Sequence, residues 1–346
     1  MASNPTVSRA VLRALFALPR PLKRALAGPP RRCGEHSLDL DFQLGGRLLA
    51  RGPAFGTSTP LATRRKLTDD AAPLLLTSET ASVTTQAMDI PAPDGHALPA
   101  RLYRPPVACG LLVFLHGGGF TTGSLASADP LCRMLAHHTG VRVLSVDYRL
   151  APEHPYPAGL DDAVTAYGYV LENRAGLGLA TNERIAVGGD SAGGNLALET
   201  AIATHGRPGP AFALALYPVA DIGRTGGSRA LFAEGMGLTA EAINEFEQHY
   251  LPGGYDATAP GPALVRRKDL GCLPPTYLSI AGFDPLRDEA HELARLLLAA
   301  QVPLVARTFP SLPHAYAAFA AFSPAAHTAL LDAAHTLRTA LRRPVA

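Results

Sequence analysis

Short, almost uniformly apolar segments recur along the chain from residue 110 onward. These segments cover residues 110–115, 142–146, 184–188, 212–218, 276–281 and 303–309. Stretches with helical spacing lie between or after them, near residues 128–138, 159–174, 192–205, 286–301 and 324–342. Short apolar runs are typical of strands buried on both faces of a parallel sheet, and their alternation with helices favours the α/β class. We therefore predict an open, doubly wound and mostly parallel sheet with flanking helices.

The segment before this alternation has two different patterns. Residues 86–91 and 97–103 alternate with a period of two around Pro93-Asp94-Gly95, which predicts a strand, a tight turn and a second strand. Residues 36–78 are leucine-rich helical pieces interrupted by glycine and proline, and they have too few apolar positions for a core of their own. We expect this segment to pack on the α/β domain.

One connection breaks the rhythm of strands and helices. Nearly 60 residues separate the apolar runs at 212–218 and 276–281, where a single crossover helix would suffice. Residues 238–251 predict one helix there, with Thr239 as its N-cap. Ligands of open α/β sheets bind outside the carboxyl ends of the strands, so we place this insertion, near 222–262, over that edge as a cap. The predicted organisation is a basic extension at 1–35, the N-terminal part of the cap at 36–80, and the α/β domain at 81–346.

Composition supports a folded chain and shows one unusual segment. The 346 residues are 47% hydrophobic and 17% charged, which allows a large core and argues against wholesale disorder. Although the net charge is only +2, seven basic residues precede the first acidic residue, Glu35. We interpret residues 1–35 as a solvated, partly disordered extension. The alternative is a basic amphipathic segment that makes weak contact with a membrane surface or a partner.

Other features exclude several classes of protein. Nucleic-acid-binding proteins usually carry their basic residues on a folded face, so we expect no nucleic-acid partner. No apolar run approaches the length of a membrane span, and Arg13 and the Arg20-Pro21 pair interrupt the stretch that a secretory signal would need. The four cysteines are widely spaced, which favours reduced thiols in a cytoplasmic protein. None of the 12 histidines falls in a familiar metal-ligand spacing, so we predict no metal site and no cofactor.

The sequence Gly189-Asp190-Ser191-Ala192-Gly193 follows one predicted strand directly and precedes a predicted helix. A strand that turns straight into a helix forces its central serine into a strained conformation and leaves little room for side chains two positions away on either side. The turn would raise the Ser191 hydroxyl above the sheet, at the positive end of a helix. The motif alone is weak evidence, but its position between strand and helix indicates a nucleophile.

The sequence His116-Gly117-Gly118-Gly119-Phe120 follows the run 110–115. Successive glycines leave backbone N–H groups free to bind an oxyanion, and this motif occurs by chance far less often than the serine motif. We assign an oxyanion hole to the N–H groups of Gly118, Gly119 and Ala192. His116 is expected to fix the shape of the loop and to take no part in proton transfer.

A nucleophilic serine needs a base and a carboxylate that orients the base. In this kind of fold they follow the serine in the order Asp or Glu, then His, each in a loop after a later strand. Asp284 follows the run 276–281 and His314 follows the run 303–309, so we assign these two residues to the triad with Ser191. The other candidates lie on predicted helices. We expect Asp288 and Glu289, on the helix after Asp284, to be capping or supporting groups and His291 to lie on the surface of that helix, whereas His327 and His335 lie on the last helix, away from any strand end.

Together these motifs are similar to those of the bacterial hormone-sensitive-lipase-like esterases. The resemblance rests on HGGGF at 116–120, DYRLAPEHPYPA at 147–158, GDSAGGN at 189–195, FDPLRDE at 283–289 and the PHAY histidine. It implies an α/β-hydrolase fold with an eight-stranded sheet and a helical cap, hydrolysis of short to medium acyl esters without a cofactor, and a homodimer formed at a sheet edge.

The resemblance also implies roles for single residues. It places the triad on Ser191, Asp284 and His314, and the oxyanion loop on Gly117 to Gly119 with Ala192. It implies that Glu153 braces the active-site loops, and Asp190 assigns the chain to the GDSAG branch. The chain departs from the pattern at Ala315, where the family commonly has glycine, and in its basic extension at 1–35.

These observations predict a serine carboxylester hydrolase that acts on a small-molecule ester in two acyl-transfer steps. An amidase or deacetylase would use the same triad, because the pocket and not the triad selects the acyl group. A catalytically silent binding protein on this scaffold is the alternative from another class, and the retained His314 argues against it. We expect Leu231, Phe232, Met236 and Phe246 of the cap to influence the acyl preference.

Overall fold

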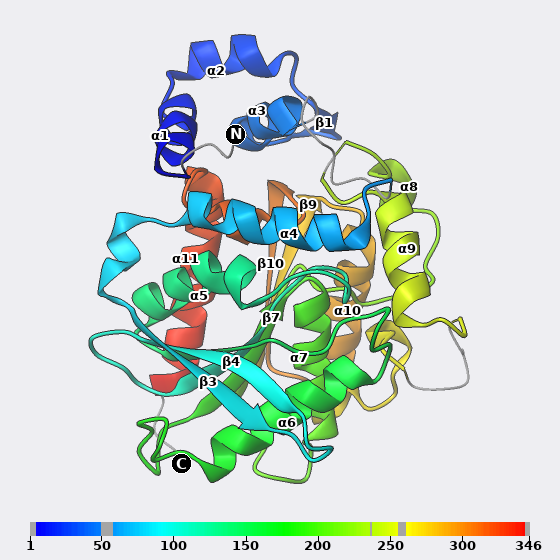
Figure 1. The fold of residues 1–346 in the computed structure, drawn as a ribbon. Coiled ribbons are helices and arrows are strands. Elements are labelled where there is room, and N and C mark those ends of the chain that lie inside the picture. Colours follow the sequence, from blue (N-terminus) through cyan, green and yellow to red (C-terminus); the bar gives the residue numbers. More distant parts are fainter. Residues whose placement is uncertain (1–4, 50–57, 236, 255–260, 343–346) are drawn as a thin grey trace.

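The centre of the protein is one eight-stranded sheet (Figure 1). A computed structural model describes residues 5–49, 58–235, 237–254 and 261–342. The strands are β3 (Thr84–Pro91), β4 (Ala97–Arg104), β5 (Leu111–Leu115), β6 (Arg142–Val146), β7 (Ile185–Asp190), β8 (Phe212–Leu216), β9 (Thr276–Phe283) and β10 (Leu304–Pro313). Their order is β10-β9-β8-β7-β5-β6-β4-β3, parallel from β10 to β6, whereas β4 is antiparallel to both its neighbours. The predicted mostly parallel sheet is confirmed.

The apolar runs form the middle of this sheet for a simple physical reason. Every residue of β5, β8 and β9 is buried, as expected of strands covered on both faces. The period-two segments instead form the β3–β4 hairpin at the sheet's edge, where most side chains of β3 are exposed. The turn between them contains Pro93-Asp94-Gly95, and Gly95 has a φ of 88° that glycine adopts without steric cost.

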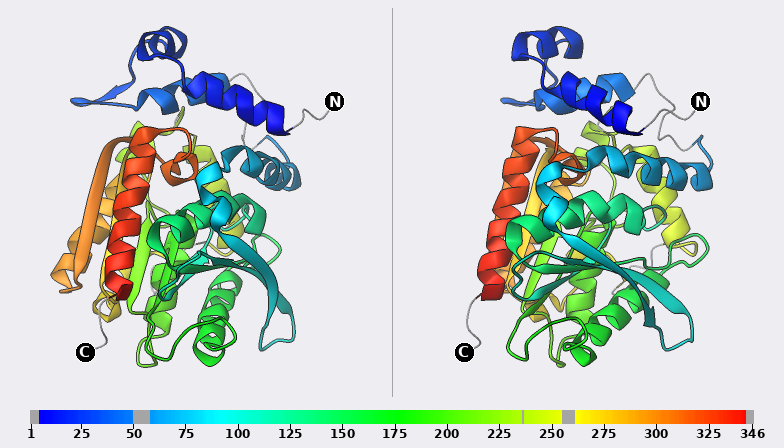
Figure 2. Two further views of the ribbon diagram at one scale, coloured as in Figure 1. Left: turned by 90° about the vertical axis from the view of Figure 1, so that its left-hand side faces the viewer. Right: turned by 60° about the vertical axis from the view of Figure 1, so that its left-hand side comes forward.

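Helices cover both faces of the sheet (Figures 1 and 2). The helices α5 (Leu125–Thr139) and α11 (Pro324–Arg342) pack on one face, and α6 (Ala158–Glu172), α7 (Ala192–Ala203) and α10 (Arg287–Ala299) pack on the other. Each face has its own apolar core, so the sheet separates two buried clusters. The helix predictions agree with these bounds to within a few residues.

Two segments distant in sequence lie above the carboxyl edge of the sheet (Figure 2). The N-terminal segment contains α1 (Pro5–Phe16), α2 (Arg20–Ala27), β1 (Arg32–Cys33), β2 (His36–Ser37), α3 (Leu40–Leu49) and α4 (Leu61–Ala71). The insertion after β8 contains α8 (Ser228–Leu231) and α9 (Ala240–Tyr250). An ion pair between Arg64 of α4 and Glu245 of α9 joins the two segments. Thr239 caps α9 by accepting a hydrogen bond from the N–H of Ala242, 3.1 Å away, as predicted.

The short connecting helices complete the chain. They are one-turn 3₁₀ helices, η1 (Ala72–Leu75), η2 (Ser78–Ser82), η3 (Leu264–Arg266), η4 (Leu270–Cys272) and η5 (Tyr316–Phe319). Of these, η1 and η2 lead from α4 to the first strand of the sheet, and both pack against α5. The N-terminal segment is thereby attached to the helices that cover the sheet through α5.

The N-terminal extension differs from the expectation of a partly disordered arm. From Pro5 it forms α1 and α2, and α2 packs on α3. The buried ammonium of Lys23 donates a 2.6 Å hydrogen bond to Asp41, and Ala27 packs against Leu40 and Leu44. The extension is therefore continuous with the cap. Its order depends on these partners in α3, which local composition does not reveal.

Within the described part of the chain, no helix combines the length and the apolar character that crossing a bilayer requires.

Candidate active site

Ser191 lies in the tight turn between β7 and α7. Its φ of 54° and ψ of −119° are strained for a residue with a side chain, as predicted for a serine raised above the sheet. A Cβ at Gly189 would collide with the backbone of Gly193 and Leu115, and one at Gly193 would collide with the carbonyls of Leu115 and His116. Steric exclusion of a side chain therefore explains both glycines of the motif, two residues before and two after Ser191.

The three residues assigned to the triad come together at the carboxyl edge of the sheet. Nε2 of His314 lies 2.8 Å from Oγ of Ser191, and Nδ1 lies 2.7 Å from Oδ2 of Asp284. The other carboxylate oxygen of Asp284 accepts a 2.8 Å hydrogen bond from the N–H of Leu286, which fixes the carboxylate plane. Asp284 is 1% exposed and Ser191 is 7% exposed. This geometry allows His314 to take the Ser191 proton while Asp284 holds the ring's tautomer.

The electrostatic environment of His314 determines its basicity. Burial by itself lowers the pKa of His314, but the charge of Asp284 and its hydrogen bond to Nδ1 raise it, and the net pKa is above its ordinary value. Tyr217 packs its ring against His314 with centroids 5.1 Å apart, which holds the imidazole in place. The site thus combines a fixed ring with a strengthened base.

We expect kcat/KM to rise with pH through the raised pKa of His314 and to level off above it. Only neutral imidazole accepts the Ser191 proton, so activity is lost as the pH falls through that pKa. The midpoint should lie above about 6.5, the ordinary pKa of histidine. A pH profile of kcat/KM on a p-nitrophenyl ester checks this. A midpoint below 6.5 would mean that burial outweighs Asp284 in the free enzyme.

The glycine loop after β5 lies beside the Ser191 hydroxyl. Gly118 and Gly119 line the same cavity as Ser191 and His314, and their φ angles are 125° and 61°. A Cβ at Gly118 would collide with the Thr122 carbonyl. Among the described residues, the N–H groups of Gly118, Gly119 and Ala192 have no hydrogen-bond acceptor. They are available for a developing oxyanion in a cavity where such hydrogen bonds are strong.

His116 and Asp190 hold this loop in position. His116 is buried, and its Nδ1 lies 2.9 Å from the Gly117 carbonyl. Its ring stacks on Tyr148, whose hydroxyl donates a 2.7 Å hydrogen bond to the His116 carbonyl. Burial lowers the pKa of His116, so the ring is neutral. Asp190 accepts a 2.8 Å hydrogen bond from the Gly117 N–H, which ties the serine turn to the glycine loop.

Glu153 lies away from the triad. Together with Arg65 it joins helix α4 to the loops that contain Thr121 and Ala151. It forms two hydrogen bonds, of 2.8 and 2.7 Å, with the guanidinium of Arg65 in α4. The same guanidinium donates to the carbonyls of Thr121 and Ala151, at 2.7 and 3.0 Å. The hydrogen bonds from Arg65 lower the pKa of Glu153 to about 2, so the carboxylate stays charged. This arrangement is consistent with a bracing role.

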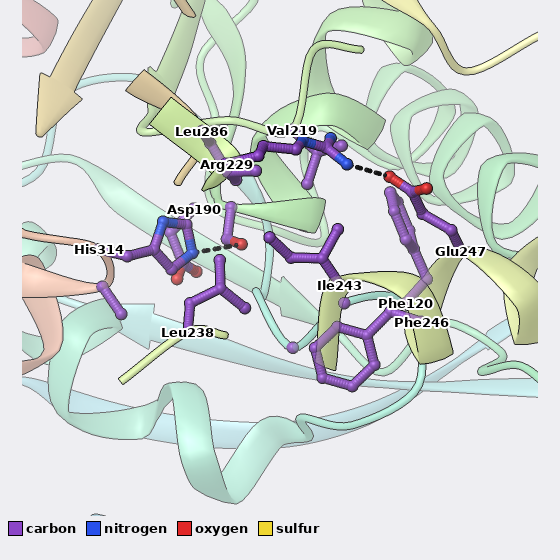
Figure 3. Close-up of a pocket in the computed structure, with 14 residues that line it drawn as sticks. Phe120, Asp190, Val219, Arg229, Leu238, Ile243, Phe246, Glu247, Leu286 and His314 are labelled. Atoms are coloured by element: carbon purple, nitrogen blue, oxygen red, sulfur yellow. Dashed lines mark hydrogen bonds and ion pairs between the residues drawn. The ribbon is translucent and has the colours of Figure 1, made fainter. Parts of the chain in front are cut away.

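A cavity of about 180 Å³ opens above Ser191 (Figure 3). One wall is formed by the glycine loop, and the others are mainly apolar side chains from the insertion and from the loops after β8 and β9: Val219, Leu238, Ile243, Phe246 and Leu286. Phe246 lies directly over the glycine loop, because a Cβ at Gly119 would collide with its ring. The cavity therefore presents an apolar compartment next to the nucleophile.

The structure contradicts two of the four residues of the insertion that were expected to influence the acyl preference. Leu231 is exposed, and Phe232 packs instead against Phe283 and Leu38. Met236 lies outside the described residues. Of the three described residues, Phe246 alone lines the cavity. All four residues are apolar, so hydrophobicity does not distinguish them. The packing of the insertion decides which of its faces lies next to Ser191.

The cavity wall contains a buried charged group that the sequence did not reveal. Arg229 pairs with Glu247 at 2.6 Å and with Glu289 at 2.9 Å, and it donates to the Asp221 carbonyl at 2.6 Å. Burial raises the pKa of Glu289 to about 7 despite the opposing effect of Arg229. Glu289 was expected to play a supporting part, but no sequence pattern connects it to Arg229. The network fixes α8, α9 and α10 around the cavity, and its Arg229–Glu247 pair is visible in Figure 3.

Ala315, the departure from the family pattern, also has a structural explanation. It adopts φ 58° and ψ 22°, in the left-handed region that favours glycine. The alanine fits there without moving His314 away from Ser191. Within the described residues, no group of three metal-ligating side chains converges on the Ser191 cavity.

Comparisons with known proteins match the fold described above. A family described as alpha/beta hydrolase fold matches residues 112–318. Carboxylic ester hydrolase LipN of Mycobacterium tuberculosis is 41% identical over 238 residues, which cover 66% of this chain and 63% of LipN. Carboxylesterase NlhH of the same species is 39% identical over 254 residues, 70% of this chain and 79% of NlhH.

Solved structures of esterases have the same fold. The hyperthermophilic esterase of Pyrobaculum calidifontis superimposes with a TM-score of 0.81 at 33% identity, covering 87% of this chain and 98% of that one. An ester hydrolase from the Lake Arreo metagenome, complexed with a bipyridine phosphonate derivative, gives a TM-score of 0.80 at 32% identity, covering 86% and 96%.

Proposed function

The chain belongs to the α/β-hydrolase family and is a carboxylic ester hydrolase similar to the hormone-sensitive-lipase-like esterases, and from this premise we propose that it cleaves short to medium acyl esters with Ser191 as nucleophile. The observation that carries the proposal is the continuous hydrogen-bonded line from Ser191 through His314 to Asp284. At its Ser191 end lies an apolar cavity, beside the backbone N–H groups of Gly118, Gly119 and Ala192, which have no acceptor within the part of the chain that the structure describes.

The first half of the reaction forms an acyl-enzyme. Oγ of Ser191 attacks the ester carbonyl carbon as Nε2 of His314 takes the hydroxyl proton. The carbonyl oxygen becomes an oxyanion, which the N–H groups of Gly118, Gly119 and Ala192 stabilise. His314 then gives its proton to the leaving alkoxide, the bond between the carbonyl carbon and the alcohol oxygen breaks, and the alcohol departs.

The second half repeats these steps with water. His314 removes a proton from the water, whose oxygen attacks the acyl carbonyl, and the oxyanion forms again in the same hole. Collapse of the intermediate returns the proton from His314 to Oγ of Ser191 and releases the acid. Asp284 stabilises the imidazolium in both halves without itself taking the proton.

The acyl group is proposed to occupy the apolar compartment under α9. Its volume of about 180 Å³ is below the roughly 300–1,000 Å³ of pockets for drug-sized ligands, which supports short to medium acyl chains. The N-terminal segment and the insertion near 222–262 together would form the cap that covers it. Hydrolysis rates across p-nitrophenyl esters from acetate to palmitate test the proposal, which requires a maximum among the shorter chains.

Phe246→Ala should move this maximum toward longer chains. Removing the ring over the glycine loop enlarges the compartment, and each added methylene that fits is worth about 1–3 kcal/mol. We expect the ratio of kcat/KM for octanoate to that for butyrate to rise at least about tenfold. Leu231→Ala, an exposed leucine of the same insertion, is the matched control and should leave the ratio unchanged. An unaltered ratio in Phe246→Ala would show that the acyl chain lies elsewhere.

An amidase or deacetylase remains the second candidate, since the same three residues serve both reactions. The two Mycobacterium tuberculosis relatives are named as ester hydrolases, which favours the ester. Comparison of kcat/KM on an ester and an amide of the same acyl group decides between them.

We also propose that the N-terminal helices touch an anionic membrane surface. Exposed Val11, Leu22 and Leu26 lie on α1 and α2 among the seven basic residues of the extension, a combination typical of interfacial helices. Cosedimentation with vesicles should require anionic lipid, and Leu22→Asn with Leu26→Asn should weaken binding at least about tenfold, because burying a leucine is worth about 1.5–3 kcal/mol. Leu298→Asn, an exposed leucine on α10, is the control. Equal binding to neutral vesicles would refute the electrostatic part.

Two further expectations remain predictions. The four cysteines, Cys33, Cys109, Cys132 and Cys272, are all free, which supports a reducing, cytoplasmic location. A homodimer through a sheet edge would use β10 or β3, the two terminal strands in the sheet order.

A further inference from the structure

Three potential metal ligands from separate elements converge outside the active site. Glu79 belongs to η2, His138 to the last turn of α5 and His327 to the first turn of α11. One ligand atom from each lies within 4.8 Å of the other two. None of the three lines the cavity that contains Ser191. The cluster is therefore separate from the ester-cleaving machinery.

The geometry of the two histidines supports a ligand between them. Their rings are perpendicular, with centroids 5.3 Å apart, and Nε2 of His138 lies 4.0 Å from a carboxylate oxygen of Glu79. Nε2 of His138 is buried, yet it has no hydrogen-bond partner among the described residues. A buried polar atom without a partner costs free energy, so this nitrogen needs a ligand that the protein itself does not supply.

We propose that Glu79, His138 and His327 form a binding site for a divalent transition-metal ion of the zinc type. Two imidazoles and one carboxylate are the donors that Zn²⁺, Co²⁺ and Ni²⁺ prefer, whereas Mg²⁺ and Ca²⁺ prefer oxygen donors alone. A water molecule completes a tetrahedral site with three protein ligands.

The ligands need only a small movement to close around the ion. Zinc binds nitrogen and oxygen at about 2.0–2.2 Å, which places neighbouring tetrahedral ligand atoms about 3.3–3.5 Å apart. The 4.0 Å between His138 and Glu79 shortens to that value by a shift of less than about 1 Å. The Glu79 side chain is 39% exposed, and the 3.3 Å hydrogen bond that its Oε1 accepts from the Thr77 hydroxyl is long, so Glu79 can make this shift. His138 is 16% exposed and is held more firmly.

The position of the site indicates its effect. Element η2 connects the N-terminal part of the cap to β3, whereas α5 and α11 cover one face of the sheet and pack against each other. A bound ion would cross-link these three elements. Since it binds the folded arrangement and not the separated ligands, it stabilises the fold by mass action.

The test is Zn²⁺ binding by the full-length, tag-free protein after treatment with a chelator. Calorimetry at pH 7 should give one equivalent of Zn²⁺ bound, and the melting temperature should rise with Zn²⁺ but not with Mg²⁺. Co²⁺ should produce the visible absorption bands of a tetrahedral site. Absence of stoichiometric Zn²⁺ binding overturns the proposal.

Variants assign the bound ion to these residues. We expect His138→Ala, His327→Ala and Glu79→Gln each to weaken Zn²⁺ binding at least about tenfold and to abolish the Zn²⁺-dependent rise in melting temperature. His335→Ala, an exposed histidine further along α11, should bind like the wild type. Circular dichroism and unchanged ester hydrolysis without metal establish that the variants are folded. Wild-type affinity in the folded His138→Ala and His327→Ala variants would locate the ion elsewhere, for example at His314, and overturn the assignment.

Discussion

Ser191→Ala should lower kcat by about 10⁶-fold, to a rate near that of the oxyanion hole and substrate binding alone. The substitution removes only Oγ, the atom that forms the covalent bond and that lies 2.8 Å from Nε2 of His314. Without it, His314 has no nucleophile to activate, and the two-step route is closed. The effect should fall on kcat rather than on KM, because the apolar walls of the cavity are unchanged.

The fold of this variant should remain intact, since alanine keeps the Cβ and the backbone of the strained turn. Loss of a hydroxyl with one hydrogen bond costs only about 1 kcal/mol of stability. Melting temperature and ester hydrolysis measured on the same preparation separate the two effects. A folded Ser191→Ala protein that retains more than a small fraction of the activity would mean that another residue attacks the ester.

Asp284→Asn should lower kcat by about 10⁴-fold, the size of effect known for the corresponding change in another serine hydrolase. In the wild type, the Asp284 carboxylate accepts hydrogen bonds from Nδ1 of His314 at 2.7 Å and from the Leu286 N–H at 2.8 Å. An amide has one acceptor oxygen for these two donors. If its NH₂ faces His314, the ring takes the tautomer with its proton on Nε2, which cannot accept the Ser191 proton.

The same change removes the charge that raises the pKa of His314. The residual activity should therefore have a pH profile whose midpoint lies lower than that of the wild type. Asp288→Asn is the matched control, because Asp288 is a nearby carboxylate that accepts from the Ser228 N–H and not from His314. We expect less than about a tenfold loss there. If Asp288→Asn is the more damaging of the two, the orienting carboxylate has been assigned wrongly.

Much of the fold was predictable because its signals are local. A run of five or six apolar residues and a helix with periodic leucines are each specified by neighbours in sequence. The predicted strands at 142–146 and 276–281 and the helix at 324–342 match the observed elements closely for this reason. The chain order of serine, carboxylate and histidine then follows from parallel strands whose carboxyl ends share one edge.

The glycine motifs were informative for a related reason. Gly189 and Gly193 are required because backbone atoms of neighbouring segments occupy the space of their side chains. Such crowding leaves a sequence signature, since only one residue type fits. The position of Ser191 could therefore be predicted, although its 2.8 Å approach to His314 could not be measured from the sequence.

Tertiary structure alone decided the features that depend on contacts between distant segments. Leu231, Phe232 and Phe246 are equally apolar, but only the packing of the insertion brings Phe246 into the cavity. The extension 1–35 looks like a solvated arm until Asp41 of α3 is seen to pair with the buried Lys23. Buried charges are tolerated only with such partners, and the partner is not a neighbour in sequence.

The sequence by itself thus determined the class of fold and the places of Ser191, Asp284 and His314 at the ends of its strands, because periodicity and steric exclusion act over a few residues. Only the folded chain decided which side chains meet across segments: the Arg229–Glu247 wall, the Arg65–Glu153 clamp, and the convergence of Glu79, His138 and His327. Each of these contacts brings together residues whose spacing along the chain follows no pattern. Their proximity is fixed by the packing of whole helices, which depends on the entire core.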